Sequence, residues 1–199
     1  MKIVSALVGL ILGAGLGVGS ALAAAGIIGP GMRLGGAIDV DGWTSDWTIG
    51  SEAANPWTRA RVARHGLLAL TKEEAVYFTR NTDDTGARLA EACTYRVSGG
   101  AHPAQWWSIT LYDATSYLPR NTDGSLSFDL TDAAAAGSAD DWSFLIAPLP
   151  ADSEWVSSRD AGQFDLTLRL YKPSPELIAN PEAMLAAPRI ERLGCGEAN

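Results

Sequence analysis

The chain has 199 residues, 47% of them hydrophobic, and a formal net charge of −8 at pH 7. This balance argues against nucleic-acid binding, because phosphate groups are held by clustered lysines and arginines, and the sequence has no such cluster. Beyond an apolar N-terminal segment, about 160 residues remain, which is the size of one domain with a hydrophobic core of its own. We expect no second domain.

The N-terminal segment is long, apolar and uncharged. From Ile3 to Ile28 no side chain is ionisable, and at about 1.5 Å per helical residue this run can cross a hydrocarbon core of about 30 Å. Small residues recur in it at every fourth position: Ser5, Gly9, Gly13, Gly17, Ala21, Ala25 and Gly29. A stripe of small side chains lets a second helix approach closely in lipid. We therefore predict a transmembrane anchor over residues 1–32 that packs against a helix of another membrane protein or of a second copy.

A cleaved signal peptide and a dinucleotide-binding loop are the alternative interpretations of this segment. A cleaved signal peptide remains an alternative, because Lys2 supplies a positive start and residues 21–25 include small residues that suit a signal peptidase. The apolar run is longer than the roughly 7 to 15 residues of a signal core, which favours an uncleaved anchor. A dinucleotide-binding loop at residues 13–19 is not expected, because that motif requires a preceding strand.

Residues 33–54 lack periodicity and any long apolar run, which predicts an extended spacer between anchor and domain. Trp43 and Trp47 lie in this spacer, and tryptophan suits both the bilayer interface and protein contacts. We expect these two residues to contact lipid or a partner, with loose packing against the domain as the alternative. Because Lys2 precedes the apolar segment and Asp39 and Asp41 follow it, the charges favour a cytoplasmic N-terminus.

The domain is expected to span residues 55–199 and to begin with a helix of about four turns. Asn55 can cap this helix, with Pro56 in its first turn. Two strands are expected next, at residues 76–79 and 93–97. Turn-forming residues at 83–86 lie between them, so we predict a hairpin or meander.

The clearest strand signal is the alternation of apolar and polar residues over 164–171. Further strands are expected around Trp107, at 143–147 and at 190–193, with short helical pieces starting near Pro175 and Pro181. Trp106 and Trp107 should point to opposite faces of their strand. Short strands with few helices predict a mainly β fold, an antiparallel β-sandwich, with a mixed α+β sheet as the alternative.

Few residues carry chemistry. Cys93 and Cys195 lack the spacing and the companions of a zinc site, so they predict one disulfide, with two buried thiols as the alternative. The two histidines, His65 and His102, match no metal-ligand spacing, and the sequence contains no nucleophile elbow or phosphate-binding loop. His65 is expected near a helix end, where an imidazolium is favoured. We predict no catalytic residue, metal site or cofactor.

Four blocks of the sequence carry a family resemblance, at residues 56–63, 70–78, 106–113 and 164–171. In this order they resemble the domain-of-unknown-function 1214 family, most closely its short membrane-anchored proteobacterial members. The resemblance covers most of the chain after Asn55. It implies a jelly-roll-like β-sandwich in the cell envelope and no established activity. Longer members usually have an Asn-Pro stretch after the Trp-Trp strand, whereas residues 118–124 of this chain depart from it.

These observations together predict a single-pass protein of the bacterial inner membrane with its domain in the periplasm. We expect a non-catalytic accessory or structural subunit whose helix packs into a larger membrane complex. A periplasmic module that binds a glycan, a lipid or a small apolar compound is the first alternative. An enzyme of unrecognised mechanism is the second.

Overall fold

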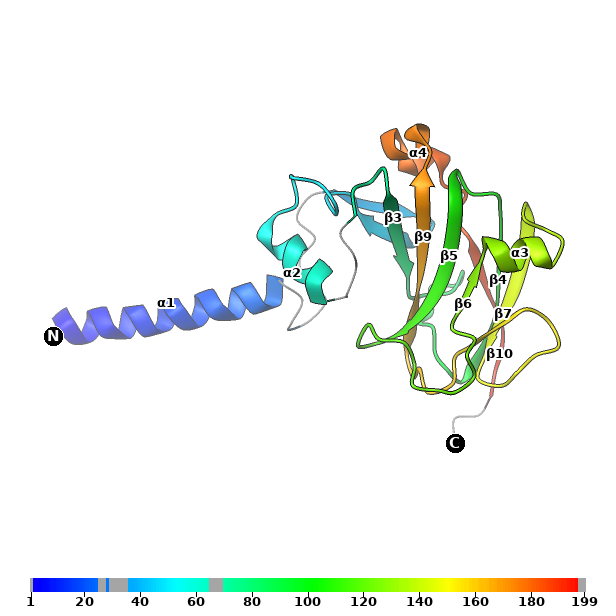
Figure 1. The fold of residues 1–199 in the computed structure, drawn as a ribbon. Coiled ribbons are helices and arrows are strands. Elements are labelled where there is room, and N and C mark those ends of the chain that lie inside the picture. The colour runs from blue at the N-terminus through cyan, green and yellow to red at the C-terminus, as the bar shows by residue number, and fades with distance from the viewer. Residues whose placement is uncertain (1, 25–27, 29–35, 65–69, 197–199) are drawn as a thin grey trace. The chain divides into compact units, whose positions relative to one another are not determined.

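The computed structural model describes residues 2–24, 28, 36–64 and 70–196 of the chain. Within these ranges the chain forms five helices and ten strands (Figure 1). It divides into two compact units. The first unit contains the N-terminal helix and the segment around the second helix, and the second unit is built around two β-sheets.

The first unit contains helices α1 (Lys2–Ala24) and α2 (Pro56–Arg64). By length and composition, Val4–Ala24 of α1 is able to cross a membrane, and the apolar stretch of this helix is not buried in the structure. The predicted cap of α2 is confirmed, because the Asn55 side-chain oxygen accepts hydrogen bonds from the backbone N–H groups of Trp57 and Thr58 at 2.9 and 3.0 Å. The remainder of the predicted helix, residues 65–69, lies outside the described residues.

The second unit contains a six-stranded and a four-stranded sheet. The six-stranded sheet has the order β1 (Ala37–Val40), β2 (Trp43–Asp46), β3 (Ala75–Arg80), β9 (Phe164–Pro173), β5 (Ala104–Asp113) and β6 (Ser127–Asp129). The four-stranded sheet has the order β10 (Arg189–Cys195), β4 (Cys93–Gly100), β7 (Asp141–Ala147) and β8 (Trp155–Ser157). The pairings β2–β3, β3–β9, β9–β5 and β5–β6 in the first sheet and β10–β4 and β4–β7 in the second are antiparallel, whereas β7 pairs with β8 in parallel.

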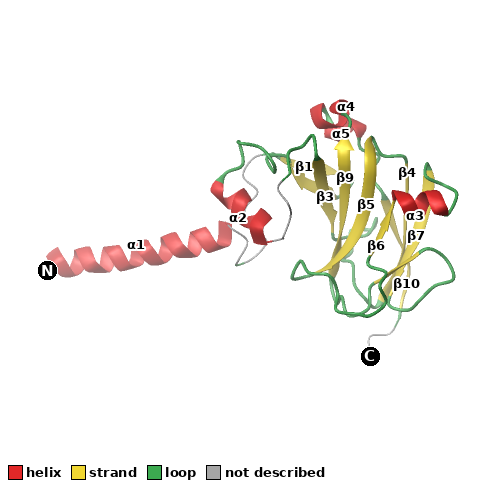
Figure 2. Cartoon of the chain, viewed as in Figure 1, coloured by secondary structure: helices red, strands yellow, loops and turns green. Residues whose placement is uncertain are grey.

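The two sheets form a sandwich, and short helices lie at its margins (Figure 2). These helices are α3 (Leu130–Ala135), α4 (Pro175–Ala179) and α5 (Pro181–Met184). The inner faces of the sheets supply a core of fully buried apolar side chains, among them Leu166, Leu168 and Leu170 of β9 and Ile146 of β7. The mainly β class is therefore confirmed, and the α+β alternative is not the fold of this chain.

The prediction of an extended spacer is wrong for residues 37–46, which form strands β1 and β2. Asp41 and Gly42 connect these strands with positive φ angles of 51° and 84°, which is the conformation of a tight two-residue hairpin turn. Trp43 is 0% exposed, and its indole N–H donates to the backbone carbonyl of Pro188 at 2.7 Å. Trp43 is thus a core residue, and its predicted contact with lipid or a partner is wrong. The division into anchor 1–32, spacer 33–54 and domain 55–199 otherwise stays a prediction.

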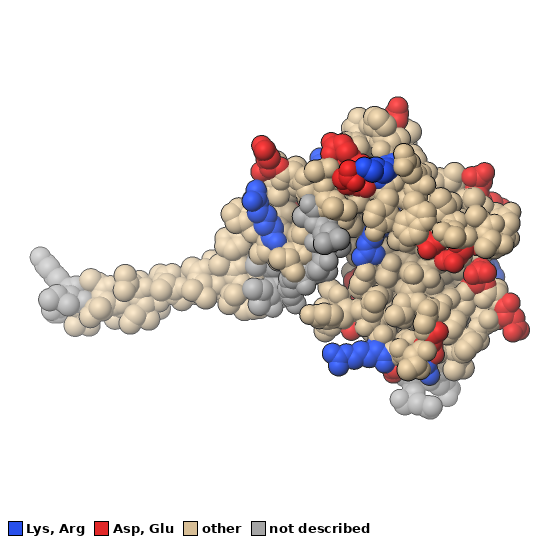
Figure 3. Space-filling view, in the orientation of Figure 1, with Lys and Arg blue, Asp and Glu red and all other residues tan. Residues whose placement is uncertain are grey.

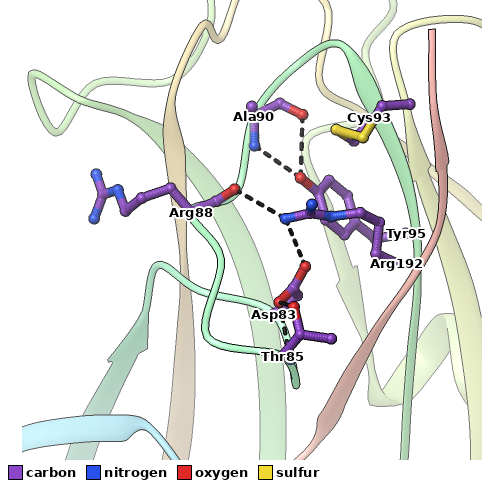
Figure 4. The surroundings of a disulfide bond; sticks show 8 residues. Asp83, Thr85, Arg88, Ala90, Cys93, Tyr95 and Arg192 are labelled. Atoms are coloured by element: carbon purple, nitrogen blue, oxygen red, sulfur yellow. Dashed lines mark hydrogen bonds and ion pairs between the residues drawn. A yellow bond between two sulfur atoms is a disulfide. The ribbon is translucent and has the colours of Figure 1, made fainter.

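The predicted hairpin of β3 with β4 is also wrong, because the two strands lie in different sheets. The turn between them is held by Asp83, whose carboxylate accepts from the backbone N–H groups of Thr85 and Ala87. Figure 4 shows Asp83 between Thr85 and Arg192. The other carboxylate oxygen lies 2.7 Å from the guanidinium of Arg192 on β10. This loop therefore joins the end of one sheet to the edge strand of the other.

A disulfide joins Cys93 and Cys195, which are 102 residues apart in sequence. The two cysteines are register partners on β4 and β10. The bond therefore attaches the edge strand β10 to its neighbour near the C-terminal end of the described chain. The predicted pairing of the cysteines agrees with the structure.

An aromatic cluster fills one end of the core between the sheets. Trp107 of β5 and Trp142 of β7 have ring centroids 4.6 Å apart, and Phe128 and Phe144 are stacked at 4.6 Å. Trp142 lies over Gly99 of β4, where an added Cβ would be only 2.5 Å from its ring. A glycine at this position therefore allows the indole to lie against the backbone.

Gly99→Ala is expected to destabilise the protein by about 1 to 3 kcal/mol, because the new methyl group displaces the Trp142 ring. Urea unfolding measures this loss. Gly194→Ala on β10 of the same sheet is the control, since nothing lies within 4 Å of an added Cβ there. Equal free energies of unfolding for the two variants would show that the close contact at Gly99 does not contribute to stability.

The double variant Cys93→Ser and Cys195→Ser is expected to lose on the order of 4 kcal/mol of stability, because the bond closes a loop of about 100 residues in the unfolded chain. Thermal unfolding with and without reductant measures the effect. The double variant should melt at one temperature in both buffers, whereas the wild type should melt lower in reductant. The disulfide would be contradicted if the melting temperature of the wild type were the same with and without reductant and its intact mass showed two free thiols.

Candidate binding face on the six-stranded sheet

The outer face is the side of the six-stranded sheet that points away from the four-stranded sheet. Its composition follows from the period of two along a strand. On β9 the leucines point into the core, so Asp165, Thr167, Arg169 and Tyr171 point outward. Figure 3 shows this side of the molecule, with acidic side chains mainly around its edges and neutral surface over most of its area.

A row of hydroxyl side chains crosses the outer face from strand to strand. We call it the hydroxyl row, and strand register aligns its five members: Thr44, Thr79, Thr167, Thr110 and Ser127. The hydroxyl oxygens of Thr79 and Thr167 lie 3.2 Å apart, and the Thr44 hydroxyl donates to the carbonyl of Thr79 at 3.1 Å. Because neighbouring strands are about 4.8 Å apart, the row is about 19 Å long.

Arg169 places a positive charge over this row. Its guanidinium donates to the hydroxyl of Thr110 at 3.0 Å and to the hydroxyl of Tyr112 at 2.5 Å. The guanidinium carbon also lies 5.2 Å from the centre of the Tyr112 ring. Within residues 36–64 and 70–196, no carboxylate lies within ion-pair distance of this guanidinium. Arg169 is half-buried, and the groups that hold its guanidinium, the Thr110 hydroxyl and the Tyr112 side chain, are neutral.

Aromatic side chains lie beside Arg169 on the outer face. Trp106 and Tyr171 are register partners with ring centroids 5.3 Å apart, and the Trp106 indole N–H donates to the Thr131 hydroxyl at 3.3 Å. Tyr77 of β3 is the register partner of Arg169. Burial raises the pKa of the Tyr77 phenol, with a further increase from Tyr171, while Arg169 opposes the increase.

Asp165 is the acidic side chain of β9 on this face. Burial raises its pKa to about 7; Arg88 and a hydrogen bond with Thr167 oppose the increase, and the negative charge of Asp113 adds to it. Asp165 is therefore partly protonated at neutral pH. Asp113 stabilises the turn that follows β5, because its carboxylate accepts hydrogen bonds from the backbone N–H groups of Thr115 and Tyr117 at 2.8 and 3.1 Å.

The histidines do not contribute to the outer face. His102 is 8% exposed, and its ring lies 5.2 Å from Trp107 and 5.8 Å from Trp142 between centroids. Neither ring nitrogen has a hydrogen-bond partner within the described ranges. Burial lowers the pKa of His102 to about 4, so the imidazole is neutral at neutral pH. His65 lies outside the described residues.

The remaining predicted residues lie in the first unit. The small residues of α1, from Ser5 through Gly9, Gly13 and Gly17 to Ala21, are helical, and Ala25 lies outside the described residues. Trp47 is half-buried, and its backbone N–H donates to the carbonyl of Gly36 at 2.6 Å. The contact of Trp47 with lipid or a partner stays a prediction. In the described part of the chain, no group of three or more His, Cys, Asp or Glu side chains can hold a metal ion.

Sequence reasoning did not identify Arg169 or the hydroxyl row. Alternation along 164–171 already placed Thr167 and Arg169 opposite the leucines. The missing information was the pairing of β9 with β3 and β5, which brings Thr79 and Thr110 level with Thr167. As predicted, Trp107 points into the core at 1% exposure and Trp106 is half-buried on the other face.

The family described as "Protein of unknown function (DUF1214)" matches residues 74–175. Comparison with curated proteins finds no match. Among solved structures, the VPA0106 protein of Vibrio parahaemolyticus is similar with a TM-score of 0.53 and 19% identity over 71% of this chain and 36% of that one. This likeness shows the fold alone.

A putative uncharacterized protein from Burkholderia cenocepacia matches with a TM-score of 0.39 and 17% identity over 63% of this chain and 31% of that one. The chain thus spans about a third of the length of these two proteins.

The burial of neutral His102 predicts a loss of stability in acid. The unfolded chain takes up a proton on this histidine near pH 6.5, whereas the folded chain does so only near pH 4. The stabilisation is therefore complete above pH 6.5 and is lost as the pH falls toward 4, by about 2 to 3 kcal/mol between pH 7.5 and 4.5. Urea unfolding of the wild type and of His102→Phe at both pH values measures it. The same acid loss in both proteins would exclude His102 as its source.

Proposed function

The chain belongs to the DUF1214 family of proteins of unknown function, and we propose that it is a non-catalytic, single-pass membrane protein of the bacterial envelope. In this proposal it acts as an accessory or structural subunit: α1 packs into a larger membrane complex, and the sandwich lies in the periplasm. The observation that carries the proposal is α1 itself. Its 23 residues extend about 34 Å at 1.5 Å per residue, which exceeds the thickness of a hydrocarbon core.

The side chains of α1 favour contact with another helix. Gly9, Gly13 and Gly17 follow one another at intervals of four residues, and nothing lies within 4 Å of an added Cβ at any of them. The surface beside these glycines is therefore open to a neighbouring backbone. Lipid removes most of the hydrophobic gain of helix association, so close backbone packing becomes its main source of attraction.

Two features favour a periplasmic domain. Lys2 precedes the apolar helix, while the acidic residues Asp39 and Asp41 follow it, in agreement with the excess of positive charge on cytoplasmic segments. The disulfide between Cys93 and Cys195 is of a kind that persists in oxidising compartments such as the periplasm. The orientation with the N-terminus in the cytoplasm satisfies both.

Gly13→Ile is expected to reduce co-purification of the full chain with its membrane complex by at least tenfold, because a branched side chain keeps the second backbone away. Solubilisation in mild detergent, affinity capture and quantitative mass spectrometry measure this loss.

Gly15→Ile is the matched control, because it makes the same change two residues away, on another side of α1, where an added Cβ also meets nothing within 4 Å. It should leave the complex intact. Equal capture of partners by both variants, a wild type that migrates as a lone monomer, or a mature protein that lacks residues 1–23 would each overturn the proposal.

A further inference from the structure

We propose that the bond between Cys93 and Cys195 is a redox latch, which a dithiol opens and closes at Cys195 while the sandwich stays folded. The latch fastens a C-terminal tail, residues 193–196, to the end of β4. Opening frees this tail and leaves the end of β4 without its strand partner. The latch lies wholly in the second unit and involves no residue of α1, so it is independent of the role proposed for the helix.

The two sulfur atoms of the bond differ in access. Cys93 is 7% exposed, whereas Cys195 is an exposed residue at the end of β10. Exchange depends on which sulfur a thiolate can reach, and the thiolate approaches in line with the S–S bond. Because β10 is the edge strand of its sheet, the approach to the Cys195 sulfur comes from outside the sheet. The approach to the Cys93 sulfur comes from within the sheet, on the side of β4 where β7 lies.

The first half of β10 is held by contacts that do not involve the disulfide. Ile190 is 0% exposed, and its backbone N–H donates to the Asp84 carboxylate at 3.1 Å. The Ile190 carbonyl accepts from the backbone N–H of Asp84 at 2.9 Å. The Arg192 guanidinium lies 2.7 Å from the Asp83 carboxylate. These contacts keep residues 189–192 in place when the bond is cut.

The C-terminal tail has few such contacts. A register shift between Arg192 and Gly194 separates it from the first half of β10. Beyond this shift Leu193 is 43% exposed, and an added Cβ at Gly194 would meet nothing within 4 Å. The Gly196 backbone N–H donates to the Ala92 carbonyl at 2.8 Å. Because the tail buries little apolar surface, the disulfide is the strongest link between it and β4.

The remainder of β4 stays packed without the bond. Tyr95, two residues after Cys93, is 0% exposed, and its phenol oxygen accepts from the backbone N–H of Ala90 at 2.9 Å. A disulfide stabilises a protein mainly by restricting the unfolded chain. Cutting it therefore removes none of the contacts of the folded core, and the structural change is confined to the tail.

The opening reaction consumes one dithiol. One of its sulfurs, as a thiolate, bonds to the Cys195 sulfur, and Cys93 leaves as a thiolate that takes up a proton. The second sulfur of the dithiol then attacks the first, and Cys195 leaves in the same way. The dithiol loses two electrons and two protons and becomes a disulfide, while the two cysteines gain them as thiols. The reverse sequence, begun by the Cys195 thiolate, closes the latch.

Reduction of the full chain in detergent with dithiothreitol, in the absence of denaturant, tests the latch. The rate of opening, followed by alkylation and intact mass, should rise linearly with the dithiothreitol concentration, because the reagent attacks the folded protein. Hydrogen exchange should then be at least tenfold faster in residues 193–196 and unchanged in residues 189–192. A bond that stays closed, a rate that reaches a plateau set by unfolding, or faster exchange throughout both sheets would overturn the proposal.

Cys93→Ser and Cys195→Ser are a matched pair, because each removes the bond and leaves one thiol. The Cys195 thiol of the first variant should react with iodoacetamide at least tenfold faster than the Cys93 thiol of the second. Equal rates, or a faster reaction of Cys93, would overturn the proposal. If either variant fails to fold, the mixed disulfide of the wild type with glutathione is trapped by acid instead. The glutathione should then be found on Cys195, and its presence mainly on Cys93 would contradict the latch.

Discussion

The burial of the inner side of β9 is the interaction on which the rest of the domain depends. Leu166, Leu168 and Leu170 are fully buried, and β9 is hydrogen-bonded to β3 on one side and to β5 on the other. A shift of the register by one residue would turn these leucines to solvent, so their burial specifies the register strongly. The same constraint determines which side chains lie on the outer face, because the residues that alternate with the buried leucines, such as Thr167 and Arg169, must point the other way.

The second sheet is tied to the first by contacts of a different kind. The β3–β4 connection crosses from one sheet to the other, and its Asp83 pairs with Arg192 of β10 while capping its own turn. On the same edge the bond between Cys93 and Cys195 fastens β10 to β4 (Figure 4 shows the surroundings). Burial alone raises the pKa of the Asp83 carboxyl, yet the hydrogen bonds from Thr85 and Ala87 and the charge of Arg192 hold that pKa below its ordinary value. Polar contacts and a disulfide thus hold this edge strand in place.

Strand β5 contributes to both the candidate site and the core: one of its faces points outward and the other points between the sheets. Trp107 joins the aromatic cluster with Trp142 and encloses a neutral His102, whereas its neighbour Trp106 lies beside Tyr171 on the outer face. The inner cluster excludes water and suppresses the charge of a histidine. The outer group, arranged around Arg169, keeps a charge and partly accessible rings. Adjacent residues of one strand therefore have opposite physical roles, set only by the alternation of the strand.

The sequence by itself determined the apolar helix, the strand at 164–171, the opposite directions of Trp106 and Trp107, the cap at Asn55 and the pairing of two cysteines, because each depends on local periodicity or on a choice among few residues. The sequence also contains a local signal for the β1–β2 hairpin, since Asp-Gly at positions 41 and 42 is typical of a hairpin turn. Only the tertiary structure decided that β3 and β4 belong to different sheets, that Trp43 is buried, and that the hydroxyl row meets Arg169. These features depend on which strands become neighbours. Strand pairing joins residues as far apart as Thr79 and Thr167, and the free energy that selects it comes from burying the whole core, so no local stretch of sequence contains it.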